Sequence, residues 1–297
     1  MSDTMVAEKP LDSTFRIRDL SFSYGKSSKL FNHLSLELRP GNIYGLLGKN
    51  GVGKTTMLKL MTGLLHAQEG ETGFMGMDPS KRNARFLSEL FFVPEDLYVP
   101  AMRIKEYIGL FSGFYPRFDL AAMDRHLAEF ELPPDAKLVA LSYGQKKKFM
   151  IAFGLAANTG LLVLDEPTNG LDIPSKSQFR KLLASSLTDD RILIVSTHQV
   201  RDMESLIDPI ILLDAGRIIF HRSVADISRC LKVGIQAEEP KDGDLLYSEK
   251  IPGGYSVMAR NRSGEESRVD LEILFNAVVA DPAKIDSAFE PVAGQAK

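Results

Sequence analysis

The feature that most constrains this chain is a glycine-rich stretch at residues 48–55, which reads Gly-Lys-Asn-Gly-Val-Gly-Lys-Thr. An apolar run at residues 42–47 predicts a buried strand before it, and the apolar spacing at residues 54–63 predicts a helix after it. Two glycines separated by four residues and followed by Lys-Thr are typical of a phosphate-binding loop. The alternative is an ordinary glycine turn that begins a helix. The strand and the helix on either side favour the phosphate loop.

The residue types in this loop suit a nucleotide. Glycines allow backbone N–H groups to surround an anion, and the start of the helix adds the positive end of its dipole. Lys54 is expected to reach the β- and γ-phosphates, and Thr55 to offer its hydroxyl to Mg²⁺. The candidate nucleotide-binding residues of the loop are Gly48, Asn50, Gly51, Gly53, Lys54, Thr55 and Thr56.

Two acidic residues follow a second apolar run. Residues 161–167 read Leu-Leu-Val-Leu-Asp-Glu-Pro, which predicts a buried strand that ends at Asp165 and Glu166. Open α/β sheets bind their ligands at the carboxyl ends of the strands, so Asp165 is expected beside the phosphate loop, as a Mg²⁺ ligand. Glu166 is then available to orient or deprotonate a water. The alternative is an acidic strand end without a catalytic role.

The remaining patterns predict an α/β fold with a mostly parallel sheet. Helical spacing over residues 104–157, broken at Tyr115-Pro116 and Pro133-Pro134, predicts a helical subdomain at about residues 96–158. The first runs predict an antiparallel β subdomain, and the last two a closing hairpin. The predicted strands outside the two regions above are residues 15–24, 34–38, 89–93, 191–195, 210–213 and 217–221, and a further helix covers 175–186.

The composition changes near residue 231. Residues 236–244 carry acids, lysine, proline and glycine with little that could form a core, which predicts a linker or a long loop. Alternating residues at 245–249 and 255–260 predict strands, and residues 271–279 have helical spacing. We therefore expect a main domain at residues 13–230 and a small α+β appendage at residues 231–297.

Composition excludes several classes of protein. The 36 basic and 39 acidic residues give a net charge of −3, which is not the basic footprint of a protein that mainly grips nucleic acid. The single cysteine, Cys230, excludes an intrachain disulfide and a cysteine-based zinc site. The longest apolar run, residues 149–157, is about half of the ~18–20 residues that cross a bilayer. Residues 1–15 show no signal-peptide pattern, so we expect the chain in the cytoplasm.

Five short sequences follow one another in a characteristic order. They are residues 48–55, Leu-Ser-Tyr-Gly-Gln at 141–145, Leu-Asp-Glu-Pro at 164–167, Gly-Leu-Asp at 170–172 and Ser-Thr-His at 196–198. This order resembles the nucleotide-binding subunits of ATP-binding cassette (ABC) transporters, over about residues 15–225. The sequence at 141–145 discriminates most, because other P-loop ATPases lack this signature. Within the family, the chain looks most similar to the single-cassette ATPases of ABC-2-type exporters.

The resemblance implies the fold of a P-loop nucleoside triphosphatase that hydrolyses ATP with Mg²⁺. It also implies a head-to-tail dimer around two ATP molecules, either a homodimer or a heterodimer with a paralogous ATPase subunit. The dimer would power a permease on a separate chain, and would be peripheral on the inner face of the plasma membrane through that permease. No nucleic-acid partner is expected.

The resemblance also implies roles for single residues. Tyr24 matches the aromatic that stacks on adenine, although a core tyrosine at a strand end is the alternative. Ser142 and Gly144, followed by Gln145, match the signature that contacts the γ-phosphate bound to the opposite subunit. His198 matches the histidine that senses the γ-phosphate, and Asp172 the acid that communicates between the two sites.

Three features need separate interpretation. Tyr143 stands where the signature usually has glycine, and Glu95 stands where the family more often has a glutamine that contacts Mg²⁺. A carboxylate accepts hydrogen bonds but does not donate them, so metal contact by Glu95 could survive while coupling to the permease changes.

Lysines 146–148 are expected in the first turn of a helix that starts near Gln145. They are either a solvated face or a positive surface toward the partner's ATP.

The helical subdomain carries several large apolar side chains. In the family this region also forms a groove for the coupling helix of the membrane subunit, so one or two of these side chains are expected to be exposed. They are Leu97, Tyr98, Met102, Phe111, Phe114 and Tyr115.

Two alternative functions are kept. The first is a soluble cassette ATPase that acts on ribosomes or DNA, against which the chain has neither a second phosphate loop nor sustained heptads. The second is a binding module that no longer hydrolyses ATP, which the presence of Lys54, Asp165, Glu166 and His198 disfavours.

Overall fold

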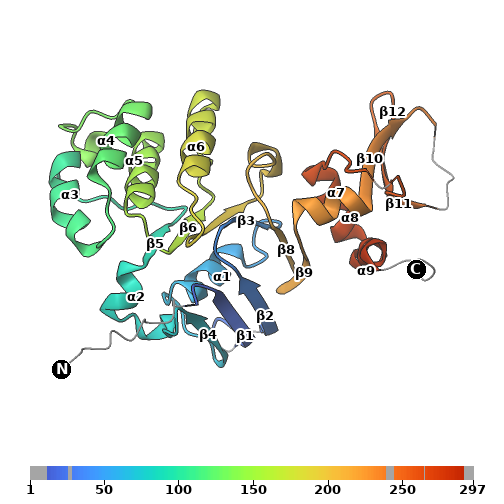
Figure 1. Ribbon diagram of the computed structural model, residues 1–297, viewed down its shortest axis with the longest axis horizontal. Coiled ribbons are helices and arrows are strands. Elements are labelled where there is room, and N and C mark those ends of the chain that lie inside the picture. The colour runs from blue at the N-terminus through green and yellow to red at the C-terminus, as the bar shows by residue number, and fades with distance from the viewer. Residues whose placement is uncertain (1–11, 26–28, 239–243, 264, 291–297) are drawn as a thin grey trace, which may run out of the picture.

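The computed structural model describes residues 12–25, 29–238, 244–263 and 265–290. Its centre is a six-stranded sheet in which five neighbouring strands are parallel and the edge strand β9 is antiparallel (Figure 1). The predicted mostly parallel sheet is confirmed. The strand order is β5 (Leu90–Val93), β6 (Leu161–Asp165), β7 (Ile192–Thr197), β3 (Asn42–Leu47), β8 (Ile210–Asp214) and β9 (Arg217–Arg222).

The central sheet is covered on both faces, which explains its continuous apolar strands. Every residue of β6 and β7 is buried, as expected for parallel strands between two layers. Successive side chains point to opposite faces: Val163 joins a core cluster with helix α1 (Lys54–Met61), and Leu164 joins the cluster on the other side. The second cluster includes residues of α5 (Tyr143–Ala156) and α6 (Ile173–Ser185).

A three-stranded antiparallel sheet lies beyond α1, in the order β2 (Phe31–Leu38), β1 (Phe15–Phe22) and β4 (Glu69–Phe74). Phe15, Ile17 and Leu36 from this sheet share a core cluster with α1. The antiparallel subdomain was predicted, but β4 was not, because its sequence Glu-Gly-Glu-Thr-Gly-Phe has glycines and a single large apolar residue.

The helical part contains α3 (Ile104–Phe111), η2 (Ser112–Phe114), α4 (Leu120–Glu129), η3 (Leu138–Ala140) and α5. The predicted breaks at the two proline positions separate α3 from α4 and α4 from α5. Aromatic rings of Tyr107, Phe149 and Phe153 pack at its centre, with centroids of Tyr107 and Phe149 5.1 Å apart. A 3₁₀ turn η1 (Pro79–Lys81) and the short α2 (Ala84–Ser88) connect β4 to β5.

The C-terminal part contains a second antiparallel sheet with helices beside it (Figure 1). Its core continues that of the main part. The ring centroids of Phe220 in β9 and Phe289 are 5.7 Å apart, and Arg222 forms an ion pair of 3.4 Å with Asp286. Most of the predicted linker, residues 239–243, lies outside the described residues. The elements are α7 (Val224–Cys230), β10 (Leu231–Gln236), β11 (Leu245–Ile251), β12 (Gly254–Arg260), α8 (Leu271–Ala280), α9 (Pro282–Asp286) and the 3₁₀ turn η5 (Ser287–Phe289). The 3₁₀ turn η4 (Val200–Asp202) lies between β7 and β8 of the central sheet.

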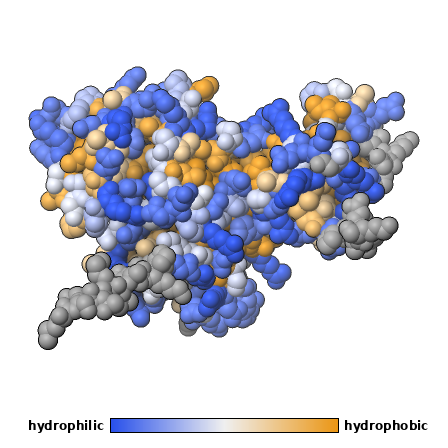
Figure 2. All heavy atoms as spheres, viewed as in Figure 1, coloured by the Kyte–Doolittle hydropathy of each residue, from blue (hydrophilic) through white to orange (hydrophobic). Residues whose placement is uncertain are grey.

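Polar residues cover most of the face drawn in Figure 2, and apolar residues gather over the helical part and across the middle of the molecule. Within the described residues, we find no helix that is long and apolar enough to span a membrane.

Candidate nucleotide-binding and catalytic site

The predicted phosphate loop connects β3 to α1. Gly53 is the N-cap of α1 with a φ of 112°, a backbone conformation that favours glycine, and a Cβ there would lie 3.0 Å from Cζ of Phe31. A Cβ on Gly48 would lie 2.6 Å from the carbonyl oxygen of Leu213 in β8. Glycine is therefore required at both positions by the packing of the loop against its neighbours.

The ammonium group of Lys54 lies inside the curve of this loop. The residue is 6% exposed, and Nζ donates to the carbonyl oxygens of Gly48 at 2.8 Å and of Lys49 at 3.4 Å. Nζ also forms an ion pair of 3.3 Å with Oε1 of Glu166. A positive charge is thus held where the backbone N–H groups of the loop favour an anion.

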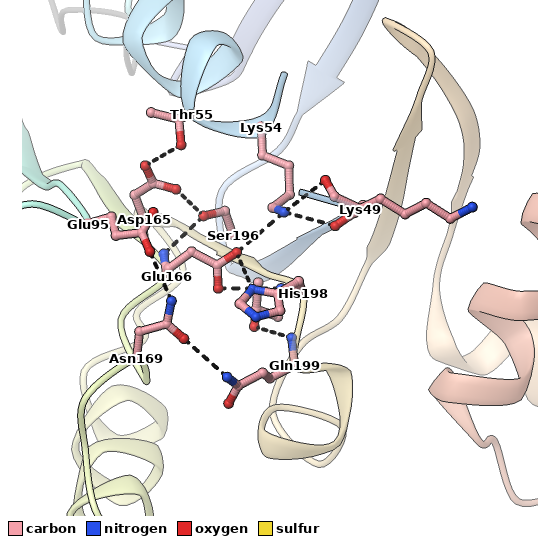
Figure 3. A network of polar contacts seen from close by, with 12 residues as sticks. Lys49, Lys54, Thr55, Glu95, Asp165, Glu166, Asn169, Ser196, His198 and Gln199 are labelled. Atoms are coloured by element: carbon pink, nitrogen blue, oxygen red, sulfur yellow. Dashed lines mark hydrogen bonds and ion pairs between the residues drawn. The ribbon is translucent and has the colours of Figure 1, made fainter. Parts of the chain in front are cut away.

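Asp165 ends strand β6 beside the start of α1, as the sequence predicts (Figure 3). Its carboxylate is fully buried and accepts hydrogen bonds from two hydroxyls: Thr55 Oγ1 at 2.7 Å and Ser196 Oγ at 2.5 Å. Ser196 belongs to β7, the strand parallel to β6. The carboxyl ends of neighbouring strands therefore bring Asp165 and Ser196 together, and the loop after β3 adds the Thr55 hydroxyl.

Glu166 adopts a left-handed backbone conformation, with a φ of 44°. Its carboxylate is nearly buried, 4% exposed, and lies between Lys54 and the Nδ1 atom of His198, which is 2.9 Å from Oε1. His198 follows β7, on the same rim as Asp165. The structure thus places the two predicted catalytic side chains in contact.

Tyr24 and Glu95 line the same cavity, whose volume is about 450 Å³. Tyr24 is 53% exposed and its hydroxyl lies 3.0 Å from Oγ1 of Thr56, so the alternative of a core tyrosine is wrong. The lining residues are Tyr24, Leu30, Lys49, Asn50, Gly51, Gly53, Lys54, Thr55, Thr56, Glu95, Glu166 and His198.

The two residues that depart from the family pattern contact each other. The Tyr143 hydroxyl donates to the backbone carbonyl of Glu95 at 2.6 Å, while the Glu95 carboxylate accepts from the Asn169 amide at 3.0 Å. Asn169 in turn accepts from the Gln199 side chain at 3.3 Å (Figure 3). Sequence reasoning missed Asn169 and Gln199, although both lie within three residues of a predicted site residue.

The signature residues lie outside this cavity. Ser142 is the N-cap of α5, and its side chain and that of Gln145 each bond the other's backbone N–H in a capping box. A Cβ on Gly144 would lie 2.8 Å from the carbonyl oxygen of Gly170. Asp172 caps α6 by accepting from the N–H of Ser175. One chain alone does not bring Ser142, Gly144 and Gln145 to its own phosphate loop.

The structure contradicts the solvated-face interpretation for one of the three lysines at 146–148. Helix α5 begins at Tyr143 rather than near Gln145, so the lysines lie beyond its first three residues. Lys147 is fully buried rather than solvated, and its Nζ donates to the backbone carbonyl of Glu166 at 2.7 Å. Burial lowers the pKa of Lys147. The missed signal was helical spacing, because Lys147 precedes the buried Met150 and Ile151 by three and four residues.

The chain is similar to known proteins of one family. The sequence model described as ABC transporter matches residues 31–169. The Nod factor export ATP-binding protein I of Rhizobium etli is 30% identical over 274 residues, which are 90% of this chain and 83% of that protein. The chain belongs to the ABC transporter ATP-binding proteins. ABC transporter ATP-binding protein YtrB of Bacillus subtilis (strain 168) is 28% identical over 81% of this chain and 85% of its own length.

Solved structures show the same ABC fold. An ATP-binding subunit of an ABC transporter superposes with a TM-score of 0.66 and 23% identity, covering 72% of this chain and 92% of that one. These findings confirm the predicted family, the P-loop fold and the assignment as an ATPase subunit of a transporter. The relatives named here give no support to the alternative of a soluble cassette ATPase on ribosomes or DNA.

Proposed function

We propose that this ABC subunit binds ATP with Mg²⁺ in the cavity at the carboxyl ends of β3, β6 and β7, and hydrolyses it to power a separate membrane permease. The observation that supports this most is the convergence of Lys54, the adjacent acids Asp165 and Glu166, and His198, from three segments of the chain, at one phosphate loop.

The donor set beside the loop fits Mg²⁺. Thr55 and Asp165 offer hard oxygen atoms that already lie 2.7 Å apart, and Glu95 lines the same cavity. No group of three or more His, Cys, Asp or Glu that could hold a metal occurs among the described residues. Mg²⁺ is commonly held by one or two carboxylates together with water and substrate phosphates, so an incomplete protein cage is the expected arrangement. When bound, the ion would neutralise charge on the phosphates.

Hydrolysis then depends on the residues around the γ-phosphate. Lys54 would exchange its contact with Glu166 for the phosphate oxygens, since both are anionic partners of the same ammonium. Glu166 is freed to accept the proton of the attacking water, while His198, held through Nδ1, offers Nε2 toward the γ-phosphate. The products are ADP and inorganic phosphate.

A second ATPase chain would complete the site. Ser142, Gly144 and Gln145 start α5 outside the cavity of their own chain, where the helix N-terminus favours an anion. We assign them to the γ-phosphate bound by the opposite subunit of a head-to-tail dimer. The opposite subunit is either a second copy of this chain or a paralogous ATPase.

The permease would dock in an apolar groove beside the helical part. This groove has a volume of about 920 Å³ and lies between the α2–β5 region and η2. Phe114, which is 64% exposed, Phe111 and Tyr115 contribute to its wall. Exposed aromatic groups of this kind mark a protein interface, and a short helix of the permease is the expected occupant.

An exporter role is proposed because several relatives, including the one from Rhizobium etli, are named as export proteins. The subunit would then lie in the cytoplasm, peripheral on the inner face of the plasma membrane.

Phe114→Asp should release the subunit from membranes without changing its affinity for ATP. The substitution places a charge on the groove wall, far from the phosphate loop in the sequence and absent from the lining of the ATP cavity. The measurement is the fraction of the protein that sediments with membranes of the producing cells. Leu120→Asp is the matched control, because Leu120 is also exposed but does not line the groove. Equal membrane binding by wild type and Phe114→Asp would place the permease elsewhere.

Truncation after Cys230 should leave ATP binding intact while lowering the melting temperature. Every residue of the cavity precedes the cut, but the truncation uncovers Phe220 and Ile227, which share a core with the deleted helices. Calorimetry and ATP titration of the truncated protein separate the two effects. Loss of ATP affinity in a truncated protein that is still folded would show that the appendage takes part in the site.

A further inference from the structure

Lys147 joins the signature helix α5 to the turn that carries Glu166. Its side chain is 0% exposed, and its ammonium donates to the backbone carbonyl of Glu166 at 2.7 Å. The ammonium also lies 5.4 Å from the centre of the Tyr143 ring, one helical turn earlier. A buried ammonium is unfavourable unless charge and hydrogen bonds compensate for lost water, so this contact requires a reason beyond filling space.

The carbonyl that Lys147 holds belongs to a strained residue. With a φ of 44°, Glu166 is in a region that non-glycine residues rarely adopt, and such a conformation persists only where neighbouring contacts enforce it. Its N–H donates to the backbone oxygen of Ser196 at 3.1 Å, and its carbonyl accepts from Lys147 and from the N–H of Asn169 at 3.2 Å. Lys147 is the charged member of this set, and charge-assisted hydrogen bonds are the stronger ones.

We propose that Lys147 is a positioning residue, which fixes the backbone of Glu166 so that its carboxylate meets the attacking water. The inference rests on the proposed role of Glu166. Because Lys147 and the signature residue Ser142 lie on the first turns of one helix, a displacement of α5 would also reach the Glu166 carbonyl directly. The contact thus ties the catalytic carboxylate to the surface that is assigned to the opposite subunit.

Lys147→Met tests this role, since methionine keeps an unbranched, flexible side chain, one atom shorter, and removes the donor. We expect kcat for ATP hydrolysis to fall roughly 10- to 100-fold, the effect of a misplaced catalytic group, while ATP affinity stays within about twofold of wild type. Lys181→Met is the matched control: Lys181 lies on the exposed side of α6, with its ammonium 3.1 Å from the Glu129 carboxylate, and should keep the wild-type rate. A wild-type kcat for Lys147→Met, or an equal loss of ATP affinity and kcat, would overturn the proposal.

A double mutant separates this inference from the proposed function. If Lys147 acts through Glu166, then Lys147→Met in a Glu166→Gln background should lower kcat little further. If the two residues act independently, the fold-losses in kcat of the two substitutions would multiply. A multiplied loss overturns the positioning role. If Glu166→Gln itself hydrolyses ATP normally, the proposed role of Glu166 fails first; if only Lys147→Met is fully active, this inference alone fails.

A second variant tests the proposal if the Lys147→Met protein does not fold. Lys147→Gln keeps an N–H donor on a side chain one atom shorter, which cannot reach the carbonyl at the observed distance. It should again lower kcat at unchanged ATP affinity. Wild-type turnover by Lys147→Gln would overturn the proposal on its own.

Discussion

Glu166→Gln should bind ATP with wild-type affinity and hydrolyse it roughly 10²- to 10⁴-fold more slowly, the usual contribution of a general base. Glutamine keeps the size of the side chain and one acceptor oxygen, but its amide cannot take the proton of the attacking water. The carboxylate lies beside His198 and Lys54, and Asp165 is committed to the Thr55 and Ser196 hydroxyls. Glu166 is therefore the acid of this cluster that remains for the water.

Phosphate release in single-turnover and steady-state assays measures this effect, with ATP titration as the separate binding measurement. Glu71→Gln is the control, because it makes the same change in an exposed carboxylate of β4, which lies 3.8 Å from the Arg18 guanidinium on the surface. Normal hydrolysis by Glu166→Gln would remove this residue from catalysis.

Lys54→Ala should weaken ATP binding by about 100-fold or more, which corresponds to about 2.8 kcal/mol at about 1.4 kcal/mol per tenfold. The substitution removes the buried ammonium that lies inside the phosphate loop, while the glycine backbone that shapes the loop stays in place. Equilibrium titration with a fluorescent ATP analogue checks the result. Lys59→Ala, in the last turn of the same helix α1, should bind like wild type. Wild-type affinity of Lys54→Ala would contradict the assignment of the loop.

The parts of the site that sequence reasoning predicted share one property: local order along the chain fixes them. A strand followed by Gly48, Gly53 and Lys54 places a loop at the start of a helix, and parallel strands bring Asp165 to the same edge. These inferences need only the period of the apolar residues and the rule for strand ends. The helix boundaries near Tyr115-Pro116 and Pro133-Pro134 follow in the same way, because proline lacks the N–H donor that a helix needs.

The parts that were missed depend on contacts between distant segments. Lys147 was grouped with its two neighbours as a charge run, although its partner, the carbonyl of Glu166, lies 19 residues away along the chain. The contact between Tyr143 and Glu95 spans 48 residues, and no pattern in either segment indicates it. Strand β4 forms because β1 offers an antiparallel edge, and not because its own residues favour a strand.

The most direct test of the two-ATP dimer is native mass measurement of Glu166→Gln with ATP and Mg²⁺. The cavity at each phosphate loop is not lined by the signature residues of its own chain. A slowly hydrolysing variant should therefore accumulate as a dimer, in which each ATP lies between Lys54 of one chain and Ser142 of the other. We predict a species of twice the 32.9 kDa chain mass that carries two ATP molecules. A monomer that carries one ATP at protein concentrations well above those used for binding would contradict a self-complementary dimer, and would require a paralogous ATPase as the second subunit.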